Sequence, residues 1–131
     1  MTSLSNIHIE STAQNTVIGT DDTSVPNNKS TTLYTFTLTP GLYIMEFQVS
    51  WSSNVNGYRV LGVAINGDSN ETMGNIYQSI IAPVEGATTR QHIVYFTKPS
   101  RTTTYDVRVK QTSGTSLTTK TRMGKIQLLT I

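Results

Sequence analysis

The segment that most constrains the fold is residues 41 to 51, where apolar and mixed side chains alternate directly after a Pro-Gly turn. Successive side chains of a β-strand point to opposite faces, so this alternation predicts one long strand. One face is continuously apolar and should lie in the core; it carries Tyr43, Met45, Phe47, Val49 and Trp51. The other face carries Leu42, Ile44, Glu46 and Gln48. A strand that faces water rarely places Leu and Ile outward, so we expect a partner to cover this second face, and another copy of the chain is the simplest one.

The composition indicates a single all-β domain that spans residues 1–131. With 36% hydrophobic residues, a chain of 131 residues can fill one core. Charged residues make up only 14% of the chain, and Thr, Ser and Asn are abundant. That mixture favours strands and polar loops over helices. The absence of cysteine excludes disulfides and thiolate metal sites.

Alternating apolar segments elsewhere predict further short strands separated by turn residues. We expect them around Ile7 and Ile9 and at residues 16–18, 33–38, 58–65, 76–82, 91–97, 105–111 and 123–131. The 33–38 strand should pair with or neighbour the 41–51 strand, the 76–82 and 91–97 strands should be central, and the last strand should be buried and central.

Two features of these strands add detail. In the 105–111 strand, Asp106, Arg108 and Lys110 should form a wet face. Asn56-Gly57 and Asn66-Gly67, which bracket the 58–65 strand, predict type I′ turns. The whole pattern predicts an antiparallel sandwich or barrel of about eight to ten strands.

Charge and hydropathy argue against several classes of partner. The net charge is +2, and the ten Lys and Arg residues are scattered singly, so nucleic-acid binding is not expected. No run of about 18 apolar residues occurs, so we expect no membrane insertion. The N-terminus lacks the basic start and apolar run of a secretion signal.

Few residues could perform catalysis or bind a metal. The chain has only two histidines, His8 and His92, and no metal-ligand spacing or paired catalytic carboxylates. The loop acids at positions 21, 22, 68 and 71 give only a weak calcium signal. We therefore expect no enzyme activity, no cofactor and no metal.

Binding is the better-supported class. Saccharide and protein recognition by β-sandwiches uses loops with planar aromatic, amide, carboxylate and guanidinium groups, and residues 52–59 and 68–71 contain them. The candidate ligand-binding residues are Asn54, Asn56, Tyr58, Arg59 and Asp68. The same residue types also make ordinary turns.

Several segments resemble the tumour necrosis factor and complement globular-head superfamily. They are Pro40-Gly41-Leu42-Tyr43, Gln48-Val49, residues 105–111 and residues 124–131. Residues 49–59, 64–67 and 111–114 are similar to the versions found in bacteriophage virion and tail-fibre proteins.

The resemblance implies a two-sheet jelly roll of about ten strands that assembles as a homotrimer at the distal end of a fibre. It also implies that the trimer interface contains Leu42, Ile44, Glu46, Gln48, Leu129 and Ile131. Glu46 then lies either near the threefold axis, paired with a cation such as Lys125 or Arg108 of a neighbouring copy, or at a wet rim.

The leading hypothesis is a non-catalytic receptor-binding head of a phage tail fibre or baseplate, located on the virion, which attaches to a host cell-surface saccharide or protein. Three linked sites would raise its avidity by about 10² to 10⁴. The alternatives are a structural trimer that caps a fibre or decorates a virion, and a bacterial surface or secreted protein of the same fold. The chain is either complete or the C-terminal head of a longer fibre protein.

Overall fold

The computed structural model describes residues 15–17, 22–67, 77–85 and 87–130, which form nine strands and no helix. The strands are β1 (Asn15–Val17), β2 (Asp22–Val25), β3 (Thr31–Leu38), β4 (Leu42–Trp51), β5 (Arg59–Ile65), β6 (Tyr77–Ile81), β7 (Thr89–Thr97), β8 (Thr103–Gln111) and β9 (Leu117–Thr130). Within these ranges, no helix is long and apolar enough to cross a membrane.

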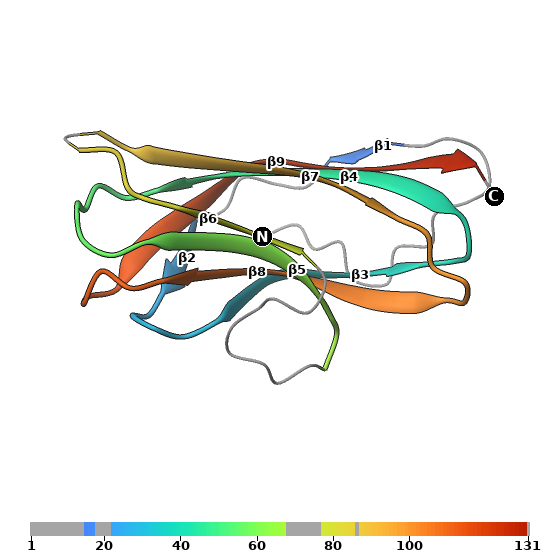
Figure 1. Ribbon diagram of the computed structural model, residues 1–131, viewed down its shortest axis with the longest axis horizontal. Helices are drawn as coiled ribbons and strands as arrows, with labels where there is room; N and C mark the ends of the chain where they lie inside the picture. Colours follow the sequence, from blue (N-terminus) through green and yellow to red (C-terminus); the bar gives the residue numbers. More distant parts are fainter. Residues whose placement is uncertain (1–14, 18–21, 68–76, 86, 131) are drawn as a thin grey trace.

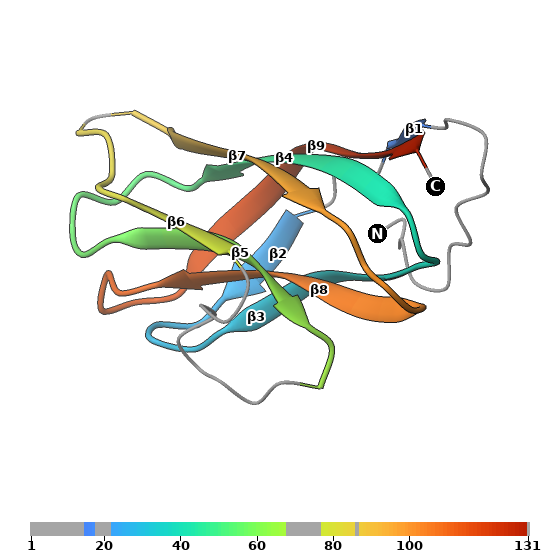
Figure 2. The ribbon, with the colours of Figure 1, turned by 45° about the vertical axis from the view of Figure 1, so that its right-hand side comes forward.

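The strands form two antiparallel sheets that pack face to face (Figures 1 and 2). One sheet has the order β1-β9-β4-β7, with β2 also pairing with β9, and the other has the order β3-β8-β5-β6. Every strand pair is antiparallel. The expected all-β antiparallel sandwich is therefore confirmed.

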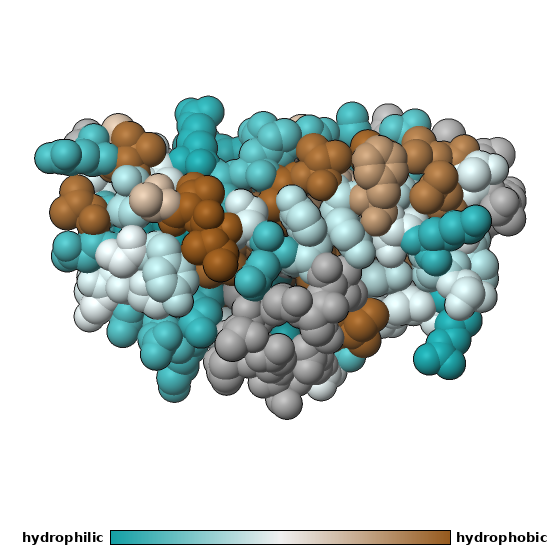
Figure 3. Space-filling model, viewed as in Figure 1, coloured by the Kyte–Doolittle hydropathy of each residue, from teal (hydrophilic) through white to brown (hydrophobic). Residues whose placement is uncertain are grey.

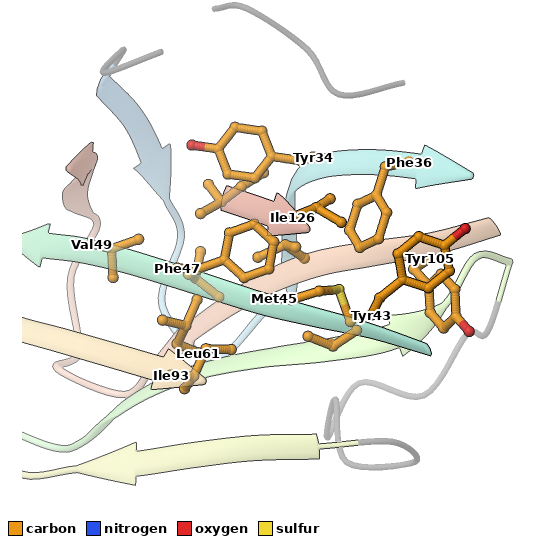
Figure 4. Close-up of a cluster of buried hydrophobic side chains, with 14 of the residues drawn as sticks. Tyr34, Phe36, Tyr43, Met45, Phe47, Val49, Leu61, Ile93, Tyr105 and Ile126 are labelled. Atoms are coloured by element: carbon orange, nitrogen blue, oxygen red, sulfur yellow. The ribbon is translucent and has the colours of Figure 1, made fainter. Parts of the chain in front are cut away.

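The core lies between the two sheets, and the alternation of β4 is confirmed. All five residues of its predicted core face, from Tyr43 to Trp51, are at most 1% exposed. They meet the inward side of β3, where the rings of Tyr34 and Phe36 lie 6.4 and 6.2 Å from that of Phe47 (Figure 4). Burying one such side chain stabilises the fold by about 1.5–3 kcal/mol, so these rings hold the sheets together.

The strand neighbours differ from expectation in two places. β3 and β4 do not pair; they belong to opposite sheets and face each other across the core. β6 and β7, which we expected to be central, each end a sheet. The two edges are joined across the sandwich by Tyr77 and Tyr95, whose stacked rings are 5.2 Å apart. The apolar runs that suggested central strands are only partly buried, because Ile80, Val94 and Phe96 are each more than 40% exposed.

The strands at the two ends of the chain agree better with the sequence. β1 corresponds to the short strand expected at residues 16–18. β9 is central, because it pairs with β4 on one side and with β1 and β2 on the other, and it starts at Leu117, earlier than expected. The strand expected around Ile7 and Ile9 lies outside the described residues.

The two Asn-Gly pairs bracket β5 as expected, but the predicted type I′ turns are wrong. A type I′ turn needs positive φ at both central residues. Only the glycines have it, at 69° for Gly57 and 86° for Gly67. The first pair belongs to a longer loop, residues 52–58, that joins strands of different sheets. A Cβ atom at Gly57 would lie 2.1 Å from the Thr112 carbonyl oxygen, so the loop requires glycine there.

The predicted wet face of β8 is also wrong. Asp106 and Arg108 point outward from their sheet but are only 4% and 6% exposed, and Lys110 is half-buried. An Nη2–Oδ2 ion pair of 2.9 Å joins Arg108 to Asp106, and Thr35 and Asn66 donate hydrogen bonds to the other carboxylate oxygen. Burial alone would raise the pKa of Asp106, but the hydrogen bonds from Asn66, Arg108 and Thr35 outweigh it and hold the pKa below its ordinary value.

Candidate functional site

The outward side of the β1-β9-β4-β7 sheet, here called the open face, carries the predicted interface residues. Leu42, Ile44, Glu46 and Gln48 are all half-buried on it. The register places Ile44 between Phe96 of β7 and Gln127 of β9. Of the remaining predicted interface residues, Leu129 is on this face and 43% exposed, and Ile131 lies outside the described residues.

The apolar side chains of the open face gather at one end. This apolar end consists of Leu42, Ile44, Val94, Phe96 and Leu129. Phe96 is 57% exposed and Val94 is 42% exposed, although both belong to a strand that also supplies core residues. Figure 3 views the molecule from the β6 and β7 edges and shows brown apolar patches over these strands, separated by polar side chains. Large apolar side chains grouped on a surface mark a site of interaction more often than scattered ones do.

Glu46, in the middle of the open face, pairs with a residue that the sequence analysis did not connect to it. Its Oε2 lies 2.8 Å from Nε2 of His92 on β7. Lys125 of β9 stands opposite Glu46 on the other side. The sequence suggested Lys125 or Arg108 of another copy as the partner. Finding His92 requires the β4–β7 register, which no local pattern provides.

Arg59, which we expected to contact a ligand, lies in the interior instead. It is fully buried and its guanidinium donates to the carbonyl oxygens of Asn54, Asn56 and Tyr58 at 2.9, 2.9 and 3.2 Å. The group also lies over the Trp51 ring, 5.9 Å from its centroid. Burial lowers the pKa of Arg59. The assignment of Arg59 to the ligand surface is thus corrected: it organises the β4–β5 loop from beneath.

The other predicted ligand residues are placed differently. Asn54 is half-buried and its Oδ1 accepts the N–H of Asn56 at 2.8 Å, a local turn contact. Asn56 and Tyr58 are exposed, and Tyr58 is anchored through its backbone N–H to Thr112 Oγ1. Asp68 lies outside the described residues. The structure therefore brings Asn54, Asn56 and Tyr58 into one loop, with two of them exposed.

Gln91 was missed by the sequence analysis, and it completes the buried polar cluster beneath this loop. Its Oε1 accepts the Trp51 indole N–H at 3.0 Å, and its Nε2 donates to the carbonyl oxygens of Arg59 and Ser79. One amide therefore joins β4, β5, β6 and β7 at the end of the core. The sequence offered one signal for this role. Gln91 falls on the inward side of its predicted strand, and a buried Gln needs hydrogen-bond partners.

A groove of about 820 Å³ lies at the other end of the sandwich, between the β7–β8 loop and the end of β5. It is lined by Tyr95 and Tyr105, by the cations Lys98 and Arg101, and by hydroxyl-bearing residues of β7 and β8. Its size is in the range of about 300–1,000 Å³ that ligand sites occupy. No sequence motif pointed to it.

The described residues contain no group of three or more His, Cys, Asp or Glu that could hold a metal ion. His8 and the loop acids at positions 21, 68 and 71 fall outside those residues.

No known family model matches this sequence, and no curated protein is significantly similar to it.

Proposed function

We propose that the sandwich is a jelly roll, as the resemblance implies. The strand pairs that support this are nested: β5 pairs with β6, β4 with β7, β3 with β8, and β2 with β9. A jelly roll has this nesting because it is a long hairpin rolled up into two sheets. The additional strand β1 pairs with β9 beyond this set.

The chain works as a homotrimer, in which the apolar ends of the open faces of three copies pack together. The observation that carries this is the apolar end, because Phe96, Leu129 and Val94 are each more than 40% exposed beside half-buried Leu42 and Ile44. Burial of apolar area contributes about 25 cal/mol per Å², so covering these side chains favours association. The number of copies comes from the resemblance to trimeric heads.

The trimer is a non-catalytic head that attaches a phage fibre or baseplate to a saccharide on the host cell surface. Exposed Tyr58 and Asn56 at one end, and the groove with Lys98, Arg101 and the half-buried Tyr95 at the other, offer aromatic and hydrogen-bonding groups of the kind that saccharide sites use. Three such sites on one particle allow weak individual contacts to hold a cell.

A structural trimer that caps a fibre or decorates a virion is the second candidate. It is favoured by the burial of Arg59, because that guanidinium donates its hydrogen bonds to carbonyl oxygens of the β4–β5 loop and not to a ligand. The third hypothesis, a bacterial surface or secreted protein, has no separate support in the geometry.

The experiment has two stages. Sedimentation equilibrium at micromolar concentration should give the mass of three chains, and a monomer would contradict the trimer. The trimer is then incubated with bacterial cells, with and without their purified cell-wall polysaccharide as competitor. Binding that the polysaccharide abolishes supports attachment, whereas a stable trimer that does not bind the cells supports the structural role.

A further inference from the structure

The end of the open face opposite the apolar end is cationic. Arg90 of β7 and Lys120 of β9 both stand opposite Ser50 of β4 in the sheet register, one on each side. Arg122, two residues further along β9, reaches the same serine, with its Nε 3.0 Å from Ser50 Oγ. One basic side chain therefore contacts the Ser50 hydroxyl group, and two more lie beside Ser50 on the neighbouring strands.

A small hollow of about 180 Å³ opens beside this serine. Its border includes Ser50, Ser52, Thr88, Thr118, Lys120 and Arg122. Ser50 is 4% exposed and accepts a hydrogen bond from Arg122, but no acceptor for its own proton exists among the residues that the structure describes. Ser52 is held in place because its Oγ accepts the Thr118 N–H at 2.9 Å.

The charges at the hollow are not neutralised within the described chain. Lys120 and Arg122 form no ion pair there, and the Nη groups of Arg122 have no partner among the same residues. The nearest acid in the register is Asp22, which stands opposite Lys120 on β2 but is exposed and makes no ion pair with it. A guanidinium, an ammonium and a buried hydroxyl around one hollow thus all have donors without an acceptor among the described residues.

We propose that this hollow binds an oxyanion group, such as a phosphate, that is carried on a saccharide or polyol. A guanidinium can donate two parallel hydrogen bonds to such a group, and Lys120 and the hydroxyls supply further donors. The hollow is smaller than the about 300–1,000 Å³ of sites that enclose a whole ligand. It therefore takes the charged group and leaves the rest of the molecule outside, as binding along a polymer requires.

This inference rests on the proposed attachment function only for the saccharide, and not for the oxyanion. It specifies an acidic rather than a neutral surface polymer as the receptor. Binding should weaken at high salt, because the charges are at the surface and are screened.

The test is a titration of the ¹⁵N-labelled protein with glycerol phosphate, inorganic phosphate and uncharged glycerol, followed by backbone amide shifts. Both phosphates should shift amides of residues 50–52, 88 and 118–122, and glycerol should shift none. The variant R122Q should bind about tenfold more weakly or worse, since a hydrogen bond to a charged group contributes about 1.5–3 kcal/mol. The control K29Q removes an exposed lysine of the β2–β3 loop, which lines neither the groove nor the hollow, and should bind normally.

Each other outcome overturns the inference. An absence of localised shifts, or an equal loss of binding in R122Q and K29Q, would show that the hollow is not an oxyanion site. If inorganic phosphate binds and glycerol phosphate does not, the bound oxyanion is not one that is carried on a polyol or saccharide. The same proteins are tested on bacterial cells: attachment that R122Q retains contradicts the acidic receptor and leaves the attachment function standing. Phosphate binding by a trimer that attaches to no cell contradicts the attachment function and leaves the oxyanion site standing.

Discussion

The outer faces of the two sheets differ in how far a single chain completes them. On the outward side of β3-β8-β5-β6, Val60, Ala64, Asp106 and Arg108 are all at most 6% exposed, and the ion pair is embedded in hydrogen bonds. On the open face, the Glu46–His92 pair is 29% and 43% exposed at its side chains, and Phe96 is more exposed still. The first face is covered within the chain over β5 and β8, although Ile80 on its β6 edge is 56% exposed. The second face has the apolar groups of an interface that another surface would complete.

The largest expected effect tests the buried side of this comparison. The substitution Asp106→Ala should destabilise the fold by about 3–5 kcal/mol, because it leaves the Arg108 charge buried without a partner. Urea denaturation at fixed protein concentration measures the change. The control Asp22→Ala, at an exposed position on β2, should stay within about 0.5 kcal/mol of the parent. A loss of under 1 kcal/mol for Asp106→Ala would mean that this face is wet in solution.

The same carboxylate should make stability depend on acid. The pKa of Asp106 is lower in the folded chain than its ordinary value of about 3.9, so the folded state favours the ionised form. Its contribution is therefore complete above about pH 4 and is lost as the pH falls through the folded-state pKa. Denaturation midpoints measured between neutral pH and pH 2 should fall more steeply for the parent than for Asp106→Asn. Parallel curves would contradict the depressed pKa.

These two faces also show what the sequence could predict. Period-two alternation identified the core side of β4, because burial there depends on each residue's own face. The burial of Asp106 depends on Thr35 and Asn66, which are 71 and 40 residues away in the chain, and no local pattern reports such contacts. The outward Leu42 and Ile44 were correctly placed on one face, but Phe96 joins them only through the β4–β7 register.

The interior role of Arg59 was missed for a related reason. From the sequence alone, an arginine that follows Asn-Gly-Tyr could equally contact a ligand or hold its own loop in place. Only the fold shows that the guanidinium turns inward over Trp51 and takes up three carbonyl groups of its own loop. The exposure of an arginine depends on where the loop carbonyls lie, and that is set by strands far away in the sequence.

The open side of the comparison is tested by a matched pair of apolar substitutions. Phe96 on the open face and Ile80 on β6 are 57% and 56% exposed. Phe96→Ser should weaken self-association by about tenfold or more, because a buried aromatic anchor contributes about 2 kcal/mol or more at an interface. Ile80→Ser should leave the association constant unchanged. Sedimentation equilibrium over a range of concentrations measures the association constants of both variants. Equal effects would show that the open face is not the interface.

The smallest expected effect concerns the exposed ion pair. His92→Gln removes the imidazole that contacts Glu46, and a pair exposed to this degree contributes at most about 1 kcal/mol to folding. We therefore expect the free energy of unfolding to change by less than about 1 kcal/mol, several-fold less than for Asp106→Ala. Glutamine keeps a hydrogen-bonding group near Glu46. Lys125 of β9 stays opposite Glu46 on its other side. Urea denaturation of dilute protein isolates the single chain from association. A loss as large as that of Asp106→Ala would show that the open face is closed even in the monomer, and the contrast between the two faces would fail.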